Sequence, residues 1–290
     1  MANRAAQDKS NKLFRDGFCV FDQVLKPDML EQVRIVSDRL IDAQSCSHFT
    51  EQKSTGSMVS VFDDVFFAKL VSYPPALSVL SNLGFNRPTW SSGFVISKPP
   101  RSPGLFWHQD WWGWDEPCSY APPPQQIFLM YYLVDTDRQN GCLRVIPGSH
   151  LQRHSLHEQV DNAHTDELRS LTDPEHPAYK PARGELDVPV RAGDLVIGDS
   201  RLLHAAHGNK SDIRRTVITL WYQPLYYQLP ESIQAYLARS ILNRFDHEDN
   251  GGPDPWMELT QGELKSLTPF YDGEVEPILW NRTPGDSLKG

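Results

Sequence analysis

The sequence predicts a mainly β protein, either an antiparallel barrel or a double-sheet jelly roll, with flanking helices. Between residues 89 and 227, short apolar runs alternate with turn signals and no long helical pattern intervenes, a spacing typical of strands in such folds. Aromatic residues make up 11% of the chain and proline occurs 23 times. Aromatic side chains favour pleated surfaces and proline interrupts them, so we expect a β-rich body with long, shaped loops.

The N-terminal part is predicted to be mostly helical. Residues 9–16 indicate a short polar helix and residues 17–21 a brief strand. Pro27 opens a second helix that extends to about residue 43, because apolar side chains recur there on one helical face. These side chains are Met29, Leu30, Val33, Val36 and Leu40. A loop-like stretch follows, and then a further helix is expected over 76–83.

The predicted strands lie in the runs SGFVISKPP, GLFWHQD, QIFLMYYLVD, GCLRVIPGSH, LDVPVRAGDLVIGD and RRTVITLWYQ. A polar insertion at 152–183 separates two of them, and it is longer than an ordinary connection. After Pro230, residues 232–245 predict an amphipathic helix, followed by an acidic extension. We expect one domain over 1–290, which comprises a helical part (1–88), a barrel core (89–227) that carries the insertion, and a C-terminal helix and extension (228–290).

Charge and composition argue against several functions. The chain has 28 Lys and Arg against 37 Asp and Glu, a net charge of −9, which disfavours nucleic acid or an anionic membrane as a partner. The longest apolar run, 127–134, is far shorter than the roughly 20 residues of a membrane span. The four cysteines are widely spaced, with no CxxC pair, so we expect free thiols and a cytoplasmic location. A small-molecule substrate is the expected partner.

The tripeptide His108-Gln109-Asp110 carries the chemistry. Residues two apart in a strand point to the same face, so His108 and Asp110 can aim at one point. An imidazole and a carboxylate are two thirds of the 2-His-1-carboxylate triad, which leaves positions open on Fe(II) for a cosubstrate and oxygen. The tripeptide alone is a weak signal, because it also arises by chance.

A second histidine should come from a later strand. His204 is the best candidate because it follows a turn and an apolar strand, and His207 is its near rival. The remaining histidines considered lie at or within the insertion, namely His150, His154, His157, His164 and His176. A dicarboxylate cosubstrate also needs a cation, and arginine pairs with carboxylates through two bonds. Arg214 and Arg215 both precede a clear strand, and strand parity does not choose between them.

Several motifs together resemble the phytanoyl-CoA dioxygenase family of Fe(II)/2-oxoglutarate-dependent oxygenases. They are SKPP before the metal motif, WHQD, NGCLRVIPGSH and GDLVIGDSRLLHAAHGNKSDIRR, and the resemblance extends from the N-terminal FRDGFCVFDQVLKPDMLEQV to about Tyr222. It implies a double-stranded β-helix, a cupin-like jelly roll. It also implies that His108, Asp110 and His204 are the catalytic metal ligands, and that Arg215 meets the distal end of 2-oxoglutarate.

Further pocket residues are expected around this set. Phe94 and Met130 are expected in the cosubstrate pocket, and Met130 stands where the family commonly has tryptophan. We expect Trp112, Trp114 and Phe128 to line the substrate pocket, because aromatic walls can orient a substrate and exclude water. Trp114 would share the strand parity of Asp110 if that strand continued.

The sequence therefore predicts a 2-oxoglutarate-dependent non-haem iron dioxygenase that uses Fe(II), 2-oxoglutarate and O₂. Hydroxylation of a small molecule, with release of succinate and CO₂, is the expected outcome. The alternative is a non-catalytic jelly roll that binds a metal or a small ligand. That alternative predicts metal affinity without turnover of the cosubstrate.

Overall fold

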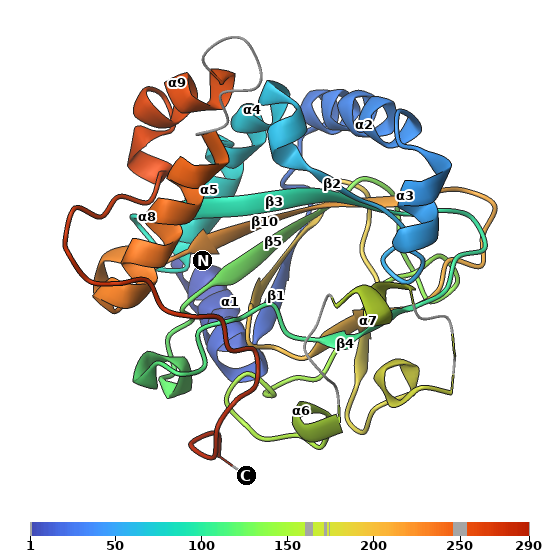
Figure 1. Ribbon diagram of the computed structural model, residues 1–290. Coiled ribbons are helices and arrows are strands. Elements are labelled where there is room, and N and C mark those ends of the chain that lie inside the picture. The colour runs from blue at the N-terminus through green and yellow to red at the C-terminus, as the bar shows by residue number, and fades with distance from the viewer. Residues whose placement is uncertain (1, 160–164, 171–172, 174, 246–253, 290) are drawn as a thin grey trace.

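The computed structural model describes residues 2–159, 165–170, 173, 175–245 and 254–289, and its strands form two antiparallel sheets (Figure 1). The larger sheet has the order β1-β8-β5-β10-β3-β2 and the smaller has β4-β9-β6-β7. The strands are Phe18–Phe21 (β1), Met58–Ser60 (β2), Thr89–Lys98 (β3), Leu105–His108 (β4), Ile127–Tyr132 (β5), Leu143–Val145 (β6), Leu186–Val188 (β7), Leu195–Asp199 (β8), His204–Ala206 (β9) and Arg215–Gln223 (β10). The predicted strand-rich core is confirmed.

Helices flank this core. They are Ala2–Asp16 (α1), Pro27–Asp42 (α2), Cys46–Glu51 (α3), Ala68–Val71 (α4), Pro74–Asn82 (α5), Leu156–Gln159 (α6), Asp166–Ser170 (α7), Glu231–Phe245 (α8) and Pro255–Gln261 (α9). The helices predicted at 27–43, 76–83 and 232–245 are found, and the first helix begins earlier than predicted. Helix α3 was not predicted. No helix among the described residues is both long and apolar enough to cross a bilayer.

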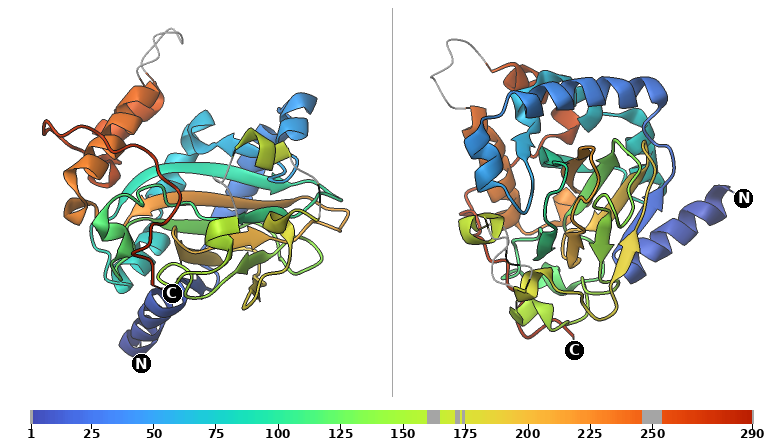
Figure 2. Two further views of the ribbon diagram at one scale, coloured as in Figure 1. Left: turned by 60° about the horizontal axis from the view of Figure 1, so that its bottom comes forward. Right: turned by 90° about the vertical axis from the view of Figure 1, so that its right-hand side faces the viewer.

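The larger sheet is covered on both faces. Helices α2, α4 and α5 lie over one face and the smaller sheet lies across the other (Figures 1 and 2). Strand β5 shows the consequence, because all of its residues are buried. Leu129 and Tyr131 belong to the core shared with the helices, whereas Phe128, Met130 and Tyr132 pack in the core that faces the smaller sheet. The unbroken apolar run of β5 is therefore explained by burial on two sides.

The two ends of the chain also join this core. β1 pairs with β8, and β2 pairs with β3, so the N-terminal part supplies two strands of the larger sheet as well as helices. Near the other end, Asn281 exchanges backbone hydrogen bonds with Trp112 and Trp114, just after β4. Parts of the insertion (160–164, 171–172 and 174) and of the extension (246–253) lie outside the described residues.

Candidate metal centre

Two histidines lie side by side on neighbouring strands of the smaller sheet. His108 is the last residue of β4 and pairs in register with His204, the first residue of β9. Their ring centroids are 4.1 Å apart, and both side chains are buried. Antiparallel pairing alone brings the two imidazoles together, although they are far apart in the sequence. His204, rather than His207, therefore joins His108.

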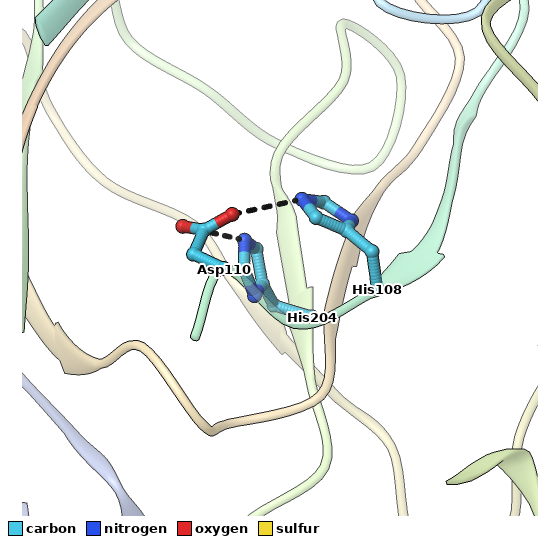
Figure 3. Close-up of side chains that lie close together, drawn as sticks. All are labelled: His108, Asp110 and His204. Carbon is cyan, nitrogen blue, oxygen red and sulfur yellow. Dashed lines mark ion pairs between the residues drawn. The ribbon is translucent and has the colours of Figure 1, made fainter. Parts of the chain in front are cut away.

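Asp110 completes the group (Figure 3). One carboxylate oxygen lies 3.6 Å from Nε2 of His108 and the other lies 3.7 Å from Nε2 of His204. The reason differs from the strand alternation we expected, because β4 ends at His108. Instead, the backbone N–H groups of Asp110 and Trp111 both donate to the carbonyl of Ser200. That turn directs the carboxylate toward the imidazoles.

The donor set suits a divalent iron ion. The ligand atoms of His108, Asp110 and His204 all lie within 4.8 Å of one another. Nδ1 of His108 lies 2.9 Å from the carbonyl of Phe106, and Nδ1 of His204 lies 2.9 Å from the carbonyl of Leu202. Because a carbonyl can only accept, each Nδ1 carries a hydrogen, and each Nε2 is the ring nitrogen that can face a metal. Two imidazoles and one carboxylate on one side of an ion form the facial arrangement used by non-haem Fe(II) oxygenases.

Trp221 on β10 orients Asp110. Its Nε1 donates to Oδ2 of Asp110 at 2.9 Å, and Trp221 shares a strand face with Arg215 because the two are an even number of residues apart.

We predict that Trp221→Phe weakens Fe(II) binding about 10-fold, since partners that orient a metal ligand contribute 10- to 100-fold to affinity. Anaerobic iron titration measures this. Trp280→Phe, at an exposed position, is the control, and equal affinity in both variants would contradict the role of Trp221.

The two neighbouring arginines go to opposite faces of β10. Arg214 bonds Asp38 and Asp42 of α2 at the outer face. Arg215 is buried and lines the cavity that contains His108 and Asp110. Burial lowers the pKa of the Arg215 guanidinium, and its Nε has no hydrogen-bond partner among the described residues. A buried guanidinium of this kind is suited to receive a carboxylate.

Lys98, at the end of β3, lies in the same cavity. Its Nζ donates to the carbonyls of Ser54 and Pro103 at 2.7 Å. Burial, followed by the charge of Arg215, holds the pKa of Lys98 well below its usual value. Two basic side chains therefore share one buried chamber, and a ligand with a negative charge would stabilise the protonated form of each. The sequence prediction missed Lys98. The signal was a lysine at the end of an apolar strand, inside the SKPP motif.

Only some of the other predicted pocket residues lie at the cavity. Met130 lines the cavity, and Phe128 lies 5.0 Å from His204 between ring centroids. Phe94 packs edge-on against Trp221. Among the described residues, Trp112 and Trp114 do not line this cavity. They are buried in an aromatic cluster against α8 and the C-terminal extension. The expected parity of Trp114 with Asp110 does not apply, since β4 ends before Asp110.

Comparison with known proteins gives one family. The family model described as phytanoyl-CoA dioxygenase (PhyH) matches residues 13–217. Phytanoyl-CoA dioxygenase 1 of Oryza sativa subsp. japonica is 30% identical over 162 residues, 54% of this chain and 52% of that protein. This chain therefore aligns with about half the length of that relative. Ectoine dioxygenase of Nocardia farcinica is 26% identical over 253 residues, 78% of this chain and 80% of that protein.

Solved structures give the same fold. The non-haem alpha-ketoglutarate-dependent epimerase SnoN from nogalamycin biosynthesis superposes with a TM-score of 0.58 at 19% identity, over 97% of this chain and 98% of that chain. EctD from S. alaskensis, solved with 2-oxoglutarate and 5-hydroxyectoine, superposes with a TM-score of 0.54 at 18% identity, over 74% of this chain and 75% of that chain. The predicted cupin-like jelly roll is confirmed.

Proposed function

Because this chain belongs to the phytanoyl-CoA dioxygenase family of Fe(II)/2-oxoglutarate-dependent oxygenases, we propose that it oxidises a small molecule with O₂ and releases succinate and CO₂. The observation that carries the proposal is the shared chamber, in which the ligand set of His108, Asp110 and His204 lies with the buried basic side chains of Lys98 and Arg215. We assign the whole chain to one domain, since β1 and β2 complete the sheet behind this chamber. The four free cysteines support a cytoplasmic setting.

Each residue has a distinct task in this proposal. His108, Asp110 and His204 hold the iron. Lys98 and Arg215 bind the distal carboxylate of 2-oxoglutarate, and they fix which end of the cosubstrate faces the metal ligands. The chemistry that Fe(II) and 2-oxoglutarate supply when bound is activation of O₂, coupled to decarboxylation of the cosubstrate and oxidation of the substrate.

The apolar walls around the ligands keep water out. Met130, Val217 and Leu143 line the chamber together with the charged groups, and all three are buried. In such an environment, the attraction between the cationic side chains and a carboxylate is stronger than in water. Thr55 and Thr219 also line it, with hydroxyl groups that have no hydrogen-bond partner among the residues described. These hydroxyls are available to a polar ligand.

The activity is tested by succinate release from 2-oxoglutarate, with Fe(II) and a panel of small amines, carboxylates and aromatic compounds. The relatives named above are a phytanoyl-CoA dioxygenase and an ectoine dioxygenase, so an acyl-CoA thioester and ectoine also belong in the panel. We expect turnover that depends on Fe(II) and rises with one substrate class. Tight binding of Fe(II) and 2-oxoglutarate, with no succinate above a metal-free control for any compound, would favour the alternative of a binding protein.

Cosubstrate binding is predicted to take up protons. Since the pKa of Lys98 is low in the empty chamber, a carboxylate placed beside it stabilises the ammonium form and raises that pKa again. Binding is therefore accompanied by protonation, and the affinity for 2-oxoglutarate falls as pH rises. Calorimetric titration in two buffers of different ionisation enthalpy measures the uptake. Lys98→Met should abolish it, and identical heats in both buffers for the unaltered protein would contradict the prediction.

A further inference from the structure

A second group of metal-ligating side chains lies beside β6, β7 and β9 of the smaller sheet. It consists of Cys142, Asp187 and His207, which we call the Cys142 cluster. One ligand atom from each residue lies within 4.8 Å of those of the other two. Nε2 of His207 lies 2.6 Å from Oδ1 of Asp187, and the Cys142 side chain is buried.

The sheet holds these residues in place. β6 pairs with β7 on one side and with β9 on the other. Cys142 directly precedes β6 and His207 directly follows β9, and the backbone N–H of His207 donates to the carbonyl of Cys142 at 3.0 Å. Asp187 is the middle residue of β7. The cluster therefore joins three neighbouring segments of a paired sheet, which fixes its geometry without a flexible loop.

We propose that the Cys142 cluster is a metal site for Zn²⁺ or a cation of similar softness. A thiolate, an imidazole and a carboxylate are the ligand types that Zn²⁺ takes, at bond lengths of about 2.0–2.3 Å. Tetrahedral geometry with these bonds separates ligand atoms by about 3.5 Å. The ligand atoms of the cluster all lie within 4.8 Å of one another, and the 2.6 Å between Nε2 of His207 and Oδ1 of Asp187 would lengthen as a metal enters. Asp187 and His207 are partly exposed, which leaves room for water as a fourth ligand.

The donor sets of the two sites differ in softness. His108, Asp110 and His204 offer nitrogen and oxygen only, whereas the Cys142 cluster adds sulfur. Sulfur ligands favour Zn²⁺, and the facial histidine–carboxylate set favours Fe(II). Burial raises the pKa of the Cys142 thiol to about 11, so a bound cation has to displace its proton, as metals do at cysteine ligands.

The cluster also borders the cosubstrate chamber. A side chain at Gly141 would come within 3.0 Å of the carbonyl oxygen of His207 and within 3.4 Å of both Nε of Arg215 and Cδ of Lys98. Gly141 has a φ of +94°, a backbone conformation that favours glycine. A cation at the Cys142 cluster would therefore brace the segment that packs against Arg215 and Lys98.

Cobalt is the probe that separates the two sites. The full-length protein is loaded with Co²⁺, and a thiolate-to-cobalt charge-transfer band in the near ultraviolet reports a sulfur ligand. We expect this band in the unaltered protein and in His108→Ala, which lacks a ligand of the iron site. Cys142→Ser should lose the band, whereas Cys46→Ser and Cys118→Ser should keep it. No band, or a band that survives Cys142→Ser, would overturn the proposal.

Zinc affinity gives a second readout that does not depend on the buried cysteine. In calorimetric titrations of the His108→Ala protein, we expect Asp187→Asn to weaken Zn²⁺ binding on the order of 10-fold or more. Asp212→Asn, an exposed carboxylate that pairs with Arg101, should leave it unchanged. Zn²⁺ should also raise the melting temperature, and Asp187→Asn should reduce this rise. Equal zinc binding in both asparagine variants would refute the site, whatever the outcome of the succinate assay.

Discussion

Replacement of Asp110, His108 or His204 is expected to reduce succinate release to background and to weaken Fe(II) binding by more than about 100-fold. Residues that only orient a metal ligand contribute 10- to 100-fold to affinity, and these variants remove a ligand itself. Asp110→Asn is the most informative change, because it keeps the shape of the side chain and its contact with Trp221 while removing the charge. Anaerobic iron titration and the succinate assay measure the two effects.

A histidine outside the chamber provides the matched control. His176 caps a short 3₁₀ turn in the insertion, where its Nδ1 accepts from the backbone N–H of Ala178. His176→Ala should retain both iron affinity and turnover, within a factor of about two. Circular dichroism of each variant checks that the fold is intact. Full activity in His204→Ala would show that a different residue holds the iron.

Arg215→Ala is expected to weaken 2-oxoglutarate binding about 10- to 100-fold. A charge-assisted pair of this kind contributes roughly 1.5–3 kcal/mol, which corresponds to that range of affinity. The effect is at the upper end because Arg215 is buried beside Lys98, where water screens the pair poorly. The KM for 2-oxoglutarate and its dissociation constant, measured by calorimetry, should both rise, while affinity for Fe(II) remains.

Arg214→Ala is the matched control on the same strand. Arg214 forms ion pairs with Asp38 and Asp42 at the protein surface, and exposed pairs contribute only about 0–1 kcal/mol to stability. Its replacement should leave 2-oxoglutarate binding unchanged. An equal loss in both variants would show that the cosubstrate is held by the general positive charge of this strand end rather than by Arg215.

The positions of the strands could be predicted from the sequence because burial leaves a recognisable signal, a short apolar run bounded by turn residues. The run at β5 and the strand before the C-terminal helix both carry it, and both were placed correctly. Helix α3 was missed since none of its residues is buried, and a helix without an apolar stripe has no hydrophobic period to recognise. Strand β2 was also missed, for a different reason. It has only three residues, and it forms by pairing with β3, a partner distant in sequence.

The candidate site was only partly predictable. The proximity of His108 and His204 depends on the register of β4 with β9, which no local pattern encodes. The resemblance supplied that pairing instead. Parity could not choose between Arg214 and Arg215, because both lie at a strand start, and only the positions of α2 and the smaller sheet separate them. Trp112 and Trp114 follow the metal motif in sequence, but a turn after His108 carries them away from the chamber walls.

The facing histidines of β4 and β9 also set when the site can form. Asp110 and the tryptophan that orients it are 111 positions apart, and every long-range strand pair closes a large loop, which slows folding. During synthesis, the three metal ligands can come together only after β9 has been made, and Trp221 on β10 joins Asp110 later still. Iron added late would then join β4 to β9 and stabilise that pairing, because metal binding to a preformed site adds to folding stability. Iron retention should thus mark chains that have completed their fold.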